Sequence, residues 1–322
     1  MTLRSAVRLV CLALVLANPL YARPPRALAW IVRMQSALHR RTYEGHYVFV
    51  DPPMVVAFSI RHAPGWEEVT TLNGARRTVL RAGHWTAVKS FSGHWVRLGG
   101  PPWYTDLPPR GHGSPLRRLA RYYRLQRVGY GRVAGERAAL VVAVPRDGYR
   151  YGYRFWIAAR SRFPLRTVLV SPAGRVLEQM MFVNVSFPAR LSPPRLVQWR
   201  RSSRASRRER AFPGSLSILP ECRPLWLPPG FRVMSDEVIP EGLRREPTRH
   251  LLVSDGLGSF SIFVRRILAG APPPLLGANS LGPINAYGRV VGDFAITVVG
   301  AVPPVTVRAT AEHVALLMPA TP

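Results

Sequence analysis

The sequence predicts an α+β protein made of two antiparallel sheet domains. One amphipathic helix precedes many short runs of β composition, brief turns rich in Gly, Pro and Asn separate those runs, and an arginine-rich stretch divides the chain. Strands joined by short connections pair as antiparallel neighbours, and a leading helix that does not alternate with strands indicates α+β. We expect a larger N-terminal domain and a smaller C-terminal domain with a sheet and a helix.

The most informative stretch is 147–166, DGYRYGYRFWIAARSRFPLR. Alternate positions carry the apolar side chains of Tyr149, Tyr151, Tyr153, Phe155 and Ile157, which predicts a strand with one apolar face. Runs of strand composition at 141–144, 163–170 and 175–185 flank it, with turn residues at 145–148, 158–162 and 171–174 between them. These four runs predict an antiparallel meander.

The first 22 residues are predicted to form a secretory signal. Arg4 and Arg8 precede an apolar run at 9–17, Pro19 breaks that run, and Ala22 offers a small residue for cleavage. The run is shorter than the ~20 apolar residues that span a bilayer. We expect cleavage after Ala22 and export without a lipid anchor.

The charge balance predicts an anionic partner. The formal net charge is +28, and nearly all the positive charge is arginine, since Lys89 is the only lysine. Such a surface attracts lipid headgroups, lipopolysaccharide, acidic protein segments or nucleic acid, and export argues against nucleic acid. Codon bias toward arginine is the alternative explanation. After removal of the signal Cys222 is the only cysteine, so no disulfide can close within the chain.

The N-terminal domain is expected to span 23–200. Leu28, Ile31, Met34 and Leu38 recur at helical spacing. Strands are expected at 43–50, 55–62, 66–72, 78–81 and 84–88, followed by a Pro- and Gly-rich loop at 99–115, a short basic helix or turn at 116–125 and a glycine-rich turn at 129–135. The meander then completes the domain.

A linker is predicted at 201–219. Six arginines lie between Arg200 and Arg210 with serines among them, and charges this dense repel one another and favour an extended, solvated segment. Arg204, Arg207 and Arg208 are therefore candidates for contact with an anion or a partner. A solvated hinge without ligand is an equally weighted alternative.

The C-terminal domain is expected at 220–322. An apolar entry at 225–231 leads to strands at 251–254 and 258–264, on either side of Asp255-Gly256. A Gly-Asp turn at 292–293 predicts a hairpin over 286–299. Two prolines at 303–304 introduce a final helix, with Val307, Ala311 and Val314 on one face.

No catalytic or metal-binding pattern is found in the sequence. The eight histidines are scattered, and neither HExxH nor a Cys/His cluster at zinc spacing occurs. No serine lies in a G-x-S-x-G motif, and Cys222 has no nucleophile motif around it. We therefore expect no catalytic residues, no metal, no cofactor and no enzymatic activity.

Short motifs in a fixed order carry a family resemblance. They are Tyr43-Glu44-Gly45, Arg61-His62-Ala63, Asn73-Gly74-Ala75-Arg76-Arg77, the stretches 147–166, 174–179 and 226–231, Ser254-Asp255-Gly256-Leu257, Ser259-Phe260-Ser261 and 286–304. Together they resemble the MucB/RseB family of periplasmic regulators of envelope-stress sigma factors. The chain departs from the family at Thr78, where Glu is frequent, in the loop at 99–115 and in its arginine content.

The resemblance implies an N-terminal domain like LolA and LolB, an open antiparallel β-barrel half wrapped around helices. It implies binding to the periplasmic segment of a membrane-spanning anti-sigma factor, protection of that segment from proteolysis, and release by lipid or lipopolysaccharide. Tyr149, Tyr151, Tyr153 and Phe155 are then candidates for the apolar lining of a ligand site. A lipid or lipoprotein carrier is the alternative function. The oligomeric state is left open, a homo-oligomer included.

Overall fold

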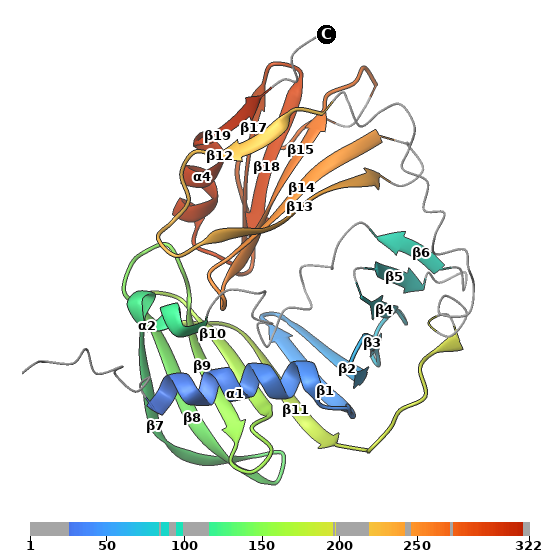
Figure 1. The fold of residues 1–322 in the computed structure, drawn as a ribbon, viewed down its shortest axis with the longest axis vertical. Coiled ribbons are helices and arrows are strands. Elements are labelled where there is room, and N and C mark those ends of the chain that lie inside the picture. Colours follow the sequence, from blue (N-terminus) through green and yellow to red (C-terminus); the bar gives the residue numbers. More distant parts are fainter. Residues whose placement is uncertain are drawn as a thin grey trace, which may run out of the picture.

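The computed structural model describes residues 26–83, 85–89, 95–98, 116–195, 197, 219–241, 246–270 and 273–317. The predicted signal at 1–22 and the loop at 99–115 lie outside these ranges, as do Arg204, Arg207 and Arg208 of the linker. Two antiparallel sheets dominate the described part of the chain (Figure 1). Within it, no helix has the length and apolar character needed to cross a membrane.

The N-terminal sheet has eleven strands in the order β6-β5-β4-β3-β2-β1-β11-β10-β9-β8-β7. Their bounds are β1 (Tyr43–Asp51), β2 (Met54–Ala63), β3 (Trp66–Thr71), β4 (Thr78–Ala82), β5 (Trp85–Lys89), β6 (Trp95–Leu98), β7 (Tyr123–Val133), β8 (Glu136–Pro145), β9 (Gly152–Ala158), β10 (Pro164–Val170) and β11 (Val176–Ser186). Strands β1 to β6 form one meander and β7 to β11 form a second, and in each of them strands that follow one another in the sequence are paired. The pairing of β1 with β11 joins the first half to the second.

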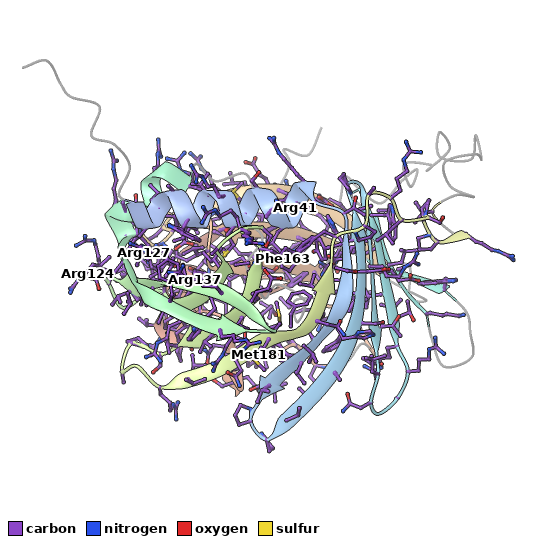
Figure 2. The ribbon with its side chains drawn as sticks, turned by 90° about the horizontal axis from the view of Figure 1, so that it is seen from below. Arg41, Arg124, Arg127, Arg137, Phe163 and Met181 are labelled. Atoms are coloured by element: carbon purple, nitrogen blue, oxygen red, sulfur yellow. The ribbon has the colours of Figure 1, made fainter. Side chains whose placement is uncertain are left out.

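Helix α1 (Arg26–Arg40) fills the curve of this sheet. Figure 1 shows it lying across the strands of the second meander, and Figure 2 shows the sheet wrapping around it. Its apolar stripe is buried as predicted: Leu28, Ile31 and Met34 pack against β8 and β9, and Leu38 packs against β1 and β11. Phe163 lies between helix and sheet, whereas Arg124 and Met181 lie on the outer side (Figure 2).

The predicted four-strand meander is confirmed as β8 to β11, with two corrections nearby. Strand β9 begins at Gly152, so Tyr149 and Arg150 lie in the preceding bend rather than in the strand. The stretch 129–135 was expected to be a turn, but β7 runs through it and only Ala134 and Gly135 turn, both with positive φ. Pairing of β7 with β8 overrides the low strand propensity of its glycines.

Two short helices, a 3₁₀ turn at Leu116–Arg118 and α2 (Leu119–Tyr122), precede β7 and match the first part of the helix or turn expected at 116–125, whereas residues 123–125 belong to β7. The C-terminal unit has a six-stranded sheet in the order β13-β14-β15-β18-β17-β16, and a two-stranded pair β12-β19. The bounds are β12 (Glu221–Pro224), β13 (Arg232–Glu241), β14 (Glu246–Ser254), β15 (Ser259–Arg266), β16 (Gly277–Leu281), β17 (Ile284–Val291), β18 (Phe294–Gly300), α4 (Pro304–Glu312) and β19 (Val314–Leu317).

The C-terminal core lies between this sheet and α4. Val307 and Ala311 of the helix meet Leu251, Ile262 and Ile296 of the sheet. Val314 was expected on the helix, but it begins β19 and reaches the same core from there. Strands β12, β13, β16 and β19 were not predicted from the sequence. The arrangement confirms the predicted α+β class, with a larger and a smaller antiparallel sheet.

Candidate ligand cavity between the two sheets

The two sheets are joined through the tight turn at 255–258, which connects β14 to β15. Leu257 at its tip is 3% exposed and packs in the N-terminal core with Tyr153, Phe155 and Ile157. The Tyr153 hydroxyl donates a 3.1 Å hydrogen bond to the Leu257 carbonyl oxygen. A residue of the C-terminal sheet therefore completes the core of the N-terminal sheet.

A buried ion pair stands beside this turn. Arg150 is 0% exposed, and its Nη1 donates to Asp255 Oδ2 at 2.6 Å. Its Nε donates to Asp147 Oδ1 at 2.9 Å and its Nη2 to the Pro229 carbonyl at 2.5 Å. The rings of Tyr122, Tyr123 and Phe231 enclose the guanidinium at 4.9 to 5.4 Å.

The Asp255 carboxylate accepts three hydrogen bonds in addition to the one from Arg150. Its Oδ1 accepts the backbone N–H groups of Leu257 and Gly258 at 2.9 and 2.8 Å, and its Oδ2 accepts the Tyr123 hydroxyl at 2.9 Å. Burial raises the pKa of Asp255, and the Arg150 charge opposes that shift. A buried ion pair with this many hydrogen bonds holds the two sheet units together, because removal of either charge leaves the other charge buried and unpaired.

Three further contacts fasten the sheets together. Asn285 Nδ2 donates to the Tyr151 hydroxyl at 3.0 Å, and Thr306 Oγ1 donates to the Tyr149 carbonyl at 2.7 Å. The Tyr149 ring meets Trp226 edge-on with centroids 5.4 Å apart. The C-terminal unit therefore packs against residues 147–151 of the N-terminal unit.

A cavity of about 500 Å³ lies next to this interface. It has the size of a small-molecule site. Most of its walls are apolar and come from both sheets: Phe49, Met54, Val56, Phe58, Val69, Val79 and Leu169 on one side, Leu252, Leu257, Phe260, Leu281, Ile284 and Val299 on the other. The sheets form this cavity only when they are docked.

The ionisable side chains in the cavity wall are Asp51, Arg77, Tyr153, Glu178 and His250. Glu178 is 8% exposed, and burial, followed by the charge of Asp51, raises its pKa to about 8. Burial also lowers the pKa of His250, whose Nε2 lies 2.9 Å from Ser261 Oγ. At neutral pH the cavity therefore holds a protonated acid and a neutral imidazole.

Comparison with known proteins follows this two-sheet division. The family model of the MucB/RseB N-terminal domain matches residues 26–199, and that of the MucB/RseB C-terminal domain matches 221–315. The chain belongs to the MucB/RseB family. The resemblance inferred from the motifs is thus confirmed.

Relatives in the MucB/RseB family match over most of their length. The sigma-E factor regulatory protein RseB of Escherichia coli K12 is 27% identical over 301 residues, 90% of this chain and 91% of that protein. The sigma factor AlgU regulatory protein MucB of Pseudomonas aeruginosa is 27% identical over 302 residues, 89% of each chain. The complex structure of Pseudomonas aeruginosa MucA/MucB superposes with a TM-score of 0.65 at 24% identity, covering 91% of this chain and 99% of that one.

The four aromatic residues predicted to line a ligand site separate into three environments. Tyr153 lines the cavity. Tyr149 and Tyr151 contact the C-terminal unit through Thr306, Trp226 and Asn285. Phe155 is fully buried beneath Tyr153, with stacked rings 5.5 Å apart. The lining role stays a prediction for all four, as does anion contact for the arginines of the linker.

Sequence reasoning missed Arg150, Asp255 and Glu178. Arg150 falls between the apolar positions Tyr149 and Tyr151, which places it on the other face of the predicted strand, and only the position of the C-terminal sheet explains its burial. Glu178 had a detectable signal, because it occupies the apolar phase of β11 with Met180 and Phe182, both buried. An acid in such a row is a candidate functional residue.

The described residues hold no group of three His, Cys, Asp or Glu side chains that could bind a metal ion. Cys222 is a buried free thiol, and burial raises its pKa to about 12. A thiol so far from ionisation is a packing residue, because the thiolate is the reactive form.

Proposed function

We propose that this protein is a negative regulator of sigma-factor activity. It binds the periplasmic segment of a membrane-spanning anti-sigma factor, shields that segment from proteolysis, and senses a lipid or lipopolysaccharide. The observation that carries the proposal is the match to the family over both sheets, since relatives matched over about nine-tenths of their length are named as sigma-factor regulatory proteins. MucB, which has the same fold, has been crystallised in complex with MucA(peri).

The proposed location is the periplasm, with the signal at 1–22 removed after Ala22. A charged start, an apolar run and a small residue at the cleavage point support this location. N-terminal sequencing of the exported protein tests it, with Arg23 expected as the first residue.

The geometry supports a binding mechanism with no catalytic step. The cavity has walls from both sheets, so an occupant can alter how the sheets are held. A ligand shifts the partner complex only if it binds the free and complexed forms with different affinity, and a ~100-fold difference corresponds to about 2.7 kcal/mol. A partner that contacts both sheets would be sensitive to such an occupant.

The test uses residues 23–322 and the labelled periplasmic segment of the single-pass anti-sigma factor from the same organism. We expect saturable binding by fluorescence anisotropy and slower cleavage of the bound segment by a broad-specificity protease. Lipopolysaccharide added below its aggregation threshold should reverse both effects. Absence of binding to the segment would overturn the proposal.

A periplasmic lipid or lipoprotein carrier is the second candidate, and the apolar cavity favours it. A carrier must take up acyl chains and deliver them. Transfer of a fluorescent acylated peptide from donor to acceptor vesicles would support the carrier, whereas segment binding without transfer would support the regulator.

A further inference from the structure

Two carboxylate side chains occupy one end of the apolar cavity. Val50 of β1 pairs with Gln179 of β11 at the end of this ladder, and continuing the same register brings Asp51 opposite Glu178. Residues directly opposite in an antiparallel pair point to the same face with Cβ atoms roughly 5 Å apart. Both side chains line the cavity, and the charge of Asp51 acts on Glu178.

Glu178 is 8% exposed. No residue in the described part of the chain hydrogen bonds or ion pairs with its carboxyl group. Its neighbours along this row of the wall are Leu169 on β10 and Tyr153 on β9, and the Tyr153 hydroxyl donates to the Leu257 carbonyl oxygen rather than to Glu178. A carboxyl group that is buried without a donor costs free energy unless something bound supplies the donor. The unused acceptor of Glu178 therefore points to a ligand.

Asp51 places this end of the cavity at the boundary between the sheets. A Cβ atom on Gly282, in the turn between β16 and β17, would lie 2.7 Å from Asp51 Oδ1. The carboxyl group thus lies against the backbone of the C-terminal sheet. The basic groups that face the cavity are Arg77 before β4 and His250 on β14.

We infer that the cavity binds an amphiphile whose polar end is a primary ammonium group held between Asp51 and Glu178. An ammonium group carries three N–H donors and one positive charge, and paired carboxyl groups accept such donors in short, charge-assisted bonds. The apolar walls take the aliphatic chain. The inference rests on the proposed ligand cavity and refines its ligand class: a protein of net charge +28 keeps two acids together at a place where they select a cation.

Binding should release a proton. Glu178 has a pKa of about 8 in the empty cavity, and an ammonium ion beside it favours the ionised form. The affinity for an alkylammonium ion should therefore rise with pH up to about 8, because a smaller fraction of the Glu178 carboxyl groups must then lose a proton on binding. The Arg77 guanidinium repels the cation equally at every pH in this range, and burial lowers the pKa of His250 and so favours its neutral form.

The experiment measures binding of decylammonium, decanol and decyl sulfate to the mature protein by titration calorimetry at high salt, which screens the arginine surface. Glu178→Gln and Asp51→Asn remove one charge each with little change of shape. Glu44→Gln is the matched control, because it changes an acid on the opposite face of β1 that does not line the cavity.

We expect decylammonium to bind the wild type at least about tenfold more tightly than decanol or decyl sulfate, and either cavity variant to lose about tenfold. Decanol affinity should stay unchanged in the cavity variants, and Glu44→Gln should bind all three as the wild type does. The pH dependence should vanish in Glu178→Gln. Equal affinity for decylammonium and decanol, or a decylammonium affinity that neither cavity variant lowers, would overturn the inference.

Two further measurements are made. One distinguishes a lipid headgroup from a small alkylamine as the ammonium ligand, and the other tests this inference separately from the proposed regulatory function. Lysophosphatidylethanolamine bound in preference to lysophosphatidylglycerol supports a lipid headgroup as the source, whereas a preference confined to decylammonium supports a small alkylamine. Anti-sigma segment binding is measured in the same samples. Segment binding without ammonium preference overturns only this inference, and ammonium preference without segment binding overturns only the proposed regulator.

Discussion

Glu178 is a buried acid in a row of apolar side chains on β11. It continues the row of Met180 and Phe182 on β11, but it ends that row in the cavity with a carboxyl group. Its raised pKa of about 8 follows from burial and from the charge of Asp51. A side chain held protonated in the folded state links stability to pH.

The sign of that linkage follows from proton binding. The pKa of Glu178 rises from an ordinary 4.5 to about 8 on folding, so between these values the folded state binds the proton that the unfolded state has lost. The free energy of unfolding should therefore fall as the pH rises from about 5 to about 8, by at most about 1.4 kcal/mol for each pH unit. Urea unfolding at both ends of this range measures the fall.

Glu178→Gln should remove this fall and be the more stable protein at about pH 9, because no charge is then buried. Glu44→Gln should keep the wild-type pH profile. Parallel profiles for the wild type and Glu178→Gln would show that Glu178 is ionised throughout.

At the scale of elements, the seam between β1 and β11 holds the two meanders together. The backbones approach closely at Gly45, where a Cβ atom would lie 2.3 Å from the Asn184 carbonyl oxygen. A register shift follows at His46 and Tyr47, and Asn184 Oδ1 accepts the His46 backbone N–H at 3.0 Å. A glycine is required at position 45 because a side chain would have no space there. Its φ is not positive, so the backbone conformation is not the reason.

Gly45→Ala should therefore force the seam apart and lower the free energy of unfolding by about 1–3 kcal/mol. Gly129→Ala is the matched control on β7, because no atom lies within 4 Å of its Cβ position. We expect that variant to stay within about 0.5 kcal/mol of the wild type. Denaturant unfolding compares the two, and equal stability would show that the seam can relax.

At the scale of the whole molecule, the buried ion pair of Arg150 and Asp255 fixes one sheet unit on the other. Both side chains are 0% exposed, and the pair adjoins the turn that carries Leu257 into the N-terminal core. The cavity walls come from both units, so its shape depends on this docking.

Arg150→Met should leave Asp255 as an unpaired buried acid and cost about 3–5 kcal/mol. In calorimetry the single unfolding transition expected of the wild type should separate into two as the units lose their connection. Adding Asp255→Asn should recover part of the loss, because the stranded charge is then gone. Arg146→Met, at an exposed arginine in the same bend, is the control. A single transition at the wild-type temperature in Arg150→Met would contradict this view of the interface.

The sequence alone determined the helix at the N-terminus, the meander around 147–166, the α+β class and the family. These features depend on alternation, helical spacing and turn residues, which act between neighbours in the chain. The glycines of β7 misled the same reasoning, because pairing with β8 outweighs local propensity.

Only the tertiary structure decided which side chains meet across the interface. Arg150 and Asp255 are 105 residues apart, and Tyr151 and Asn285 are 134 apart. The strand alternation that identified Tyr153 as inward-facing said nothing of the second sheet that covers it. Burial of a charge depends on what packs over it, and that is set by the docking of two separate sheets rather than by either strand.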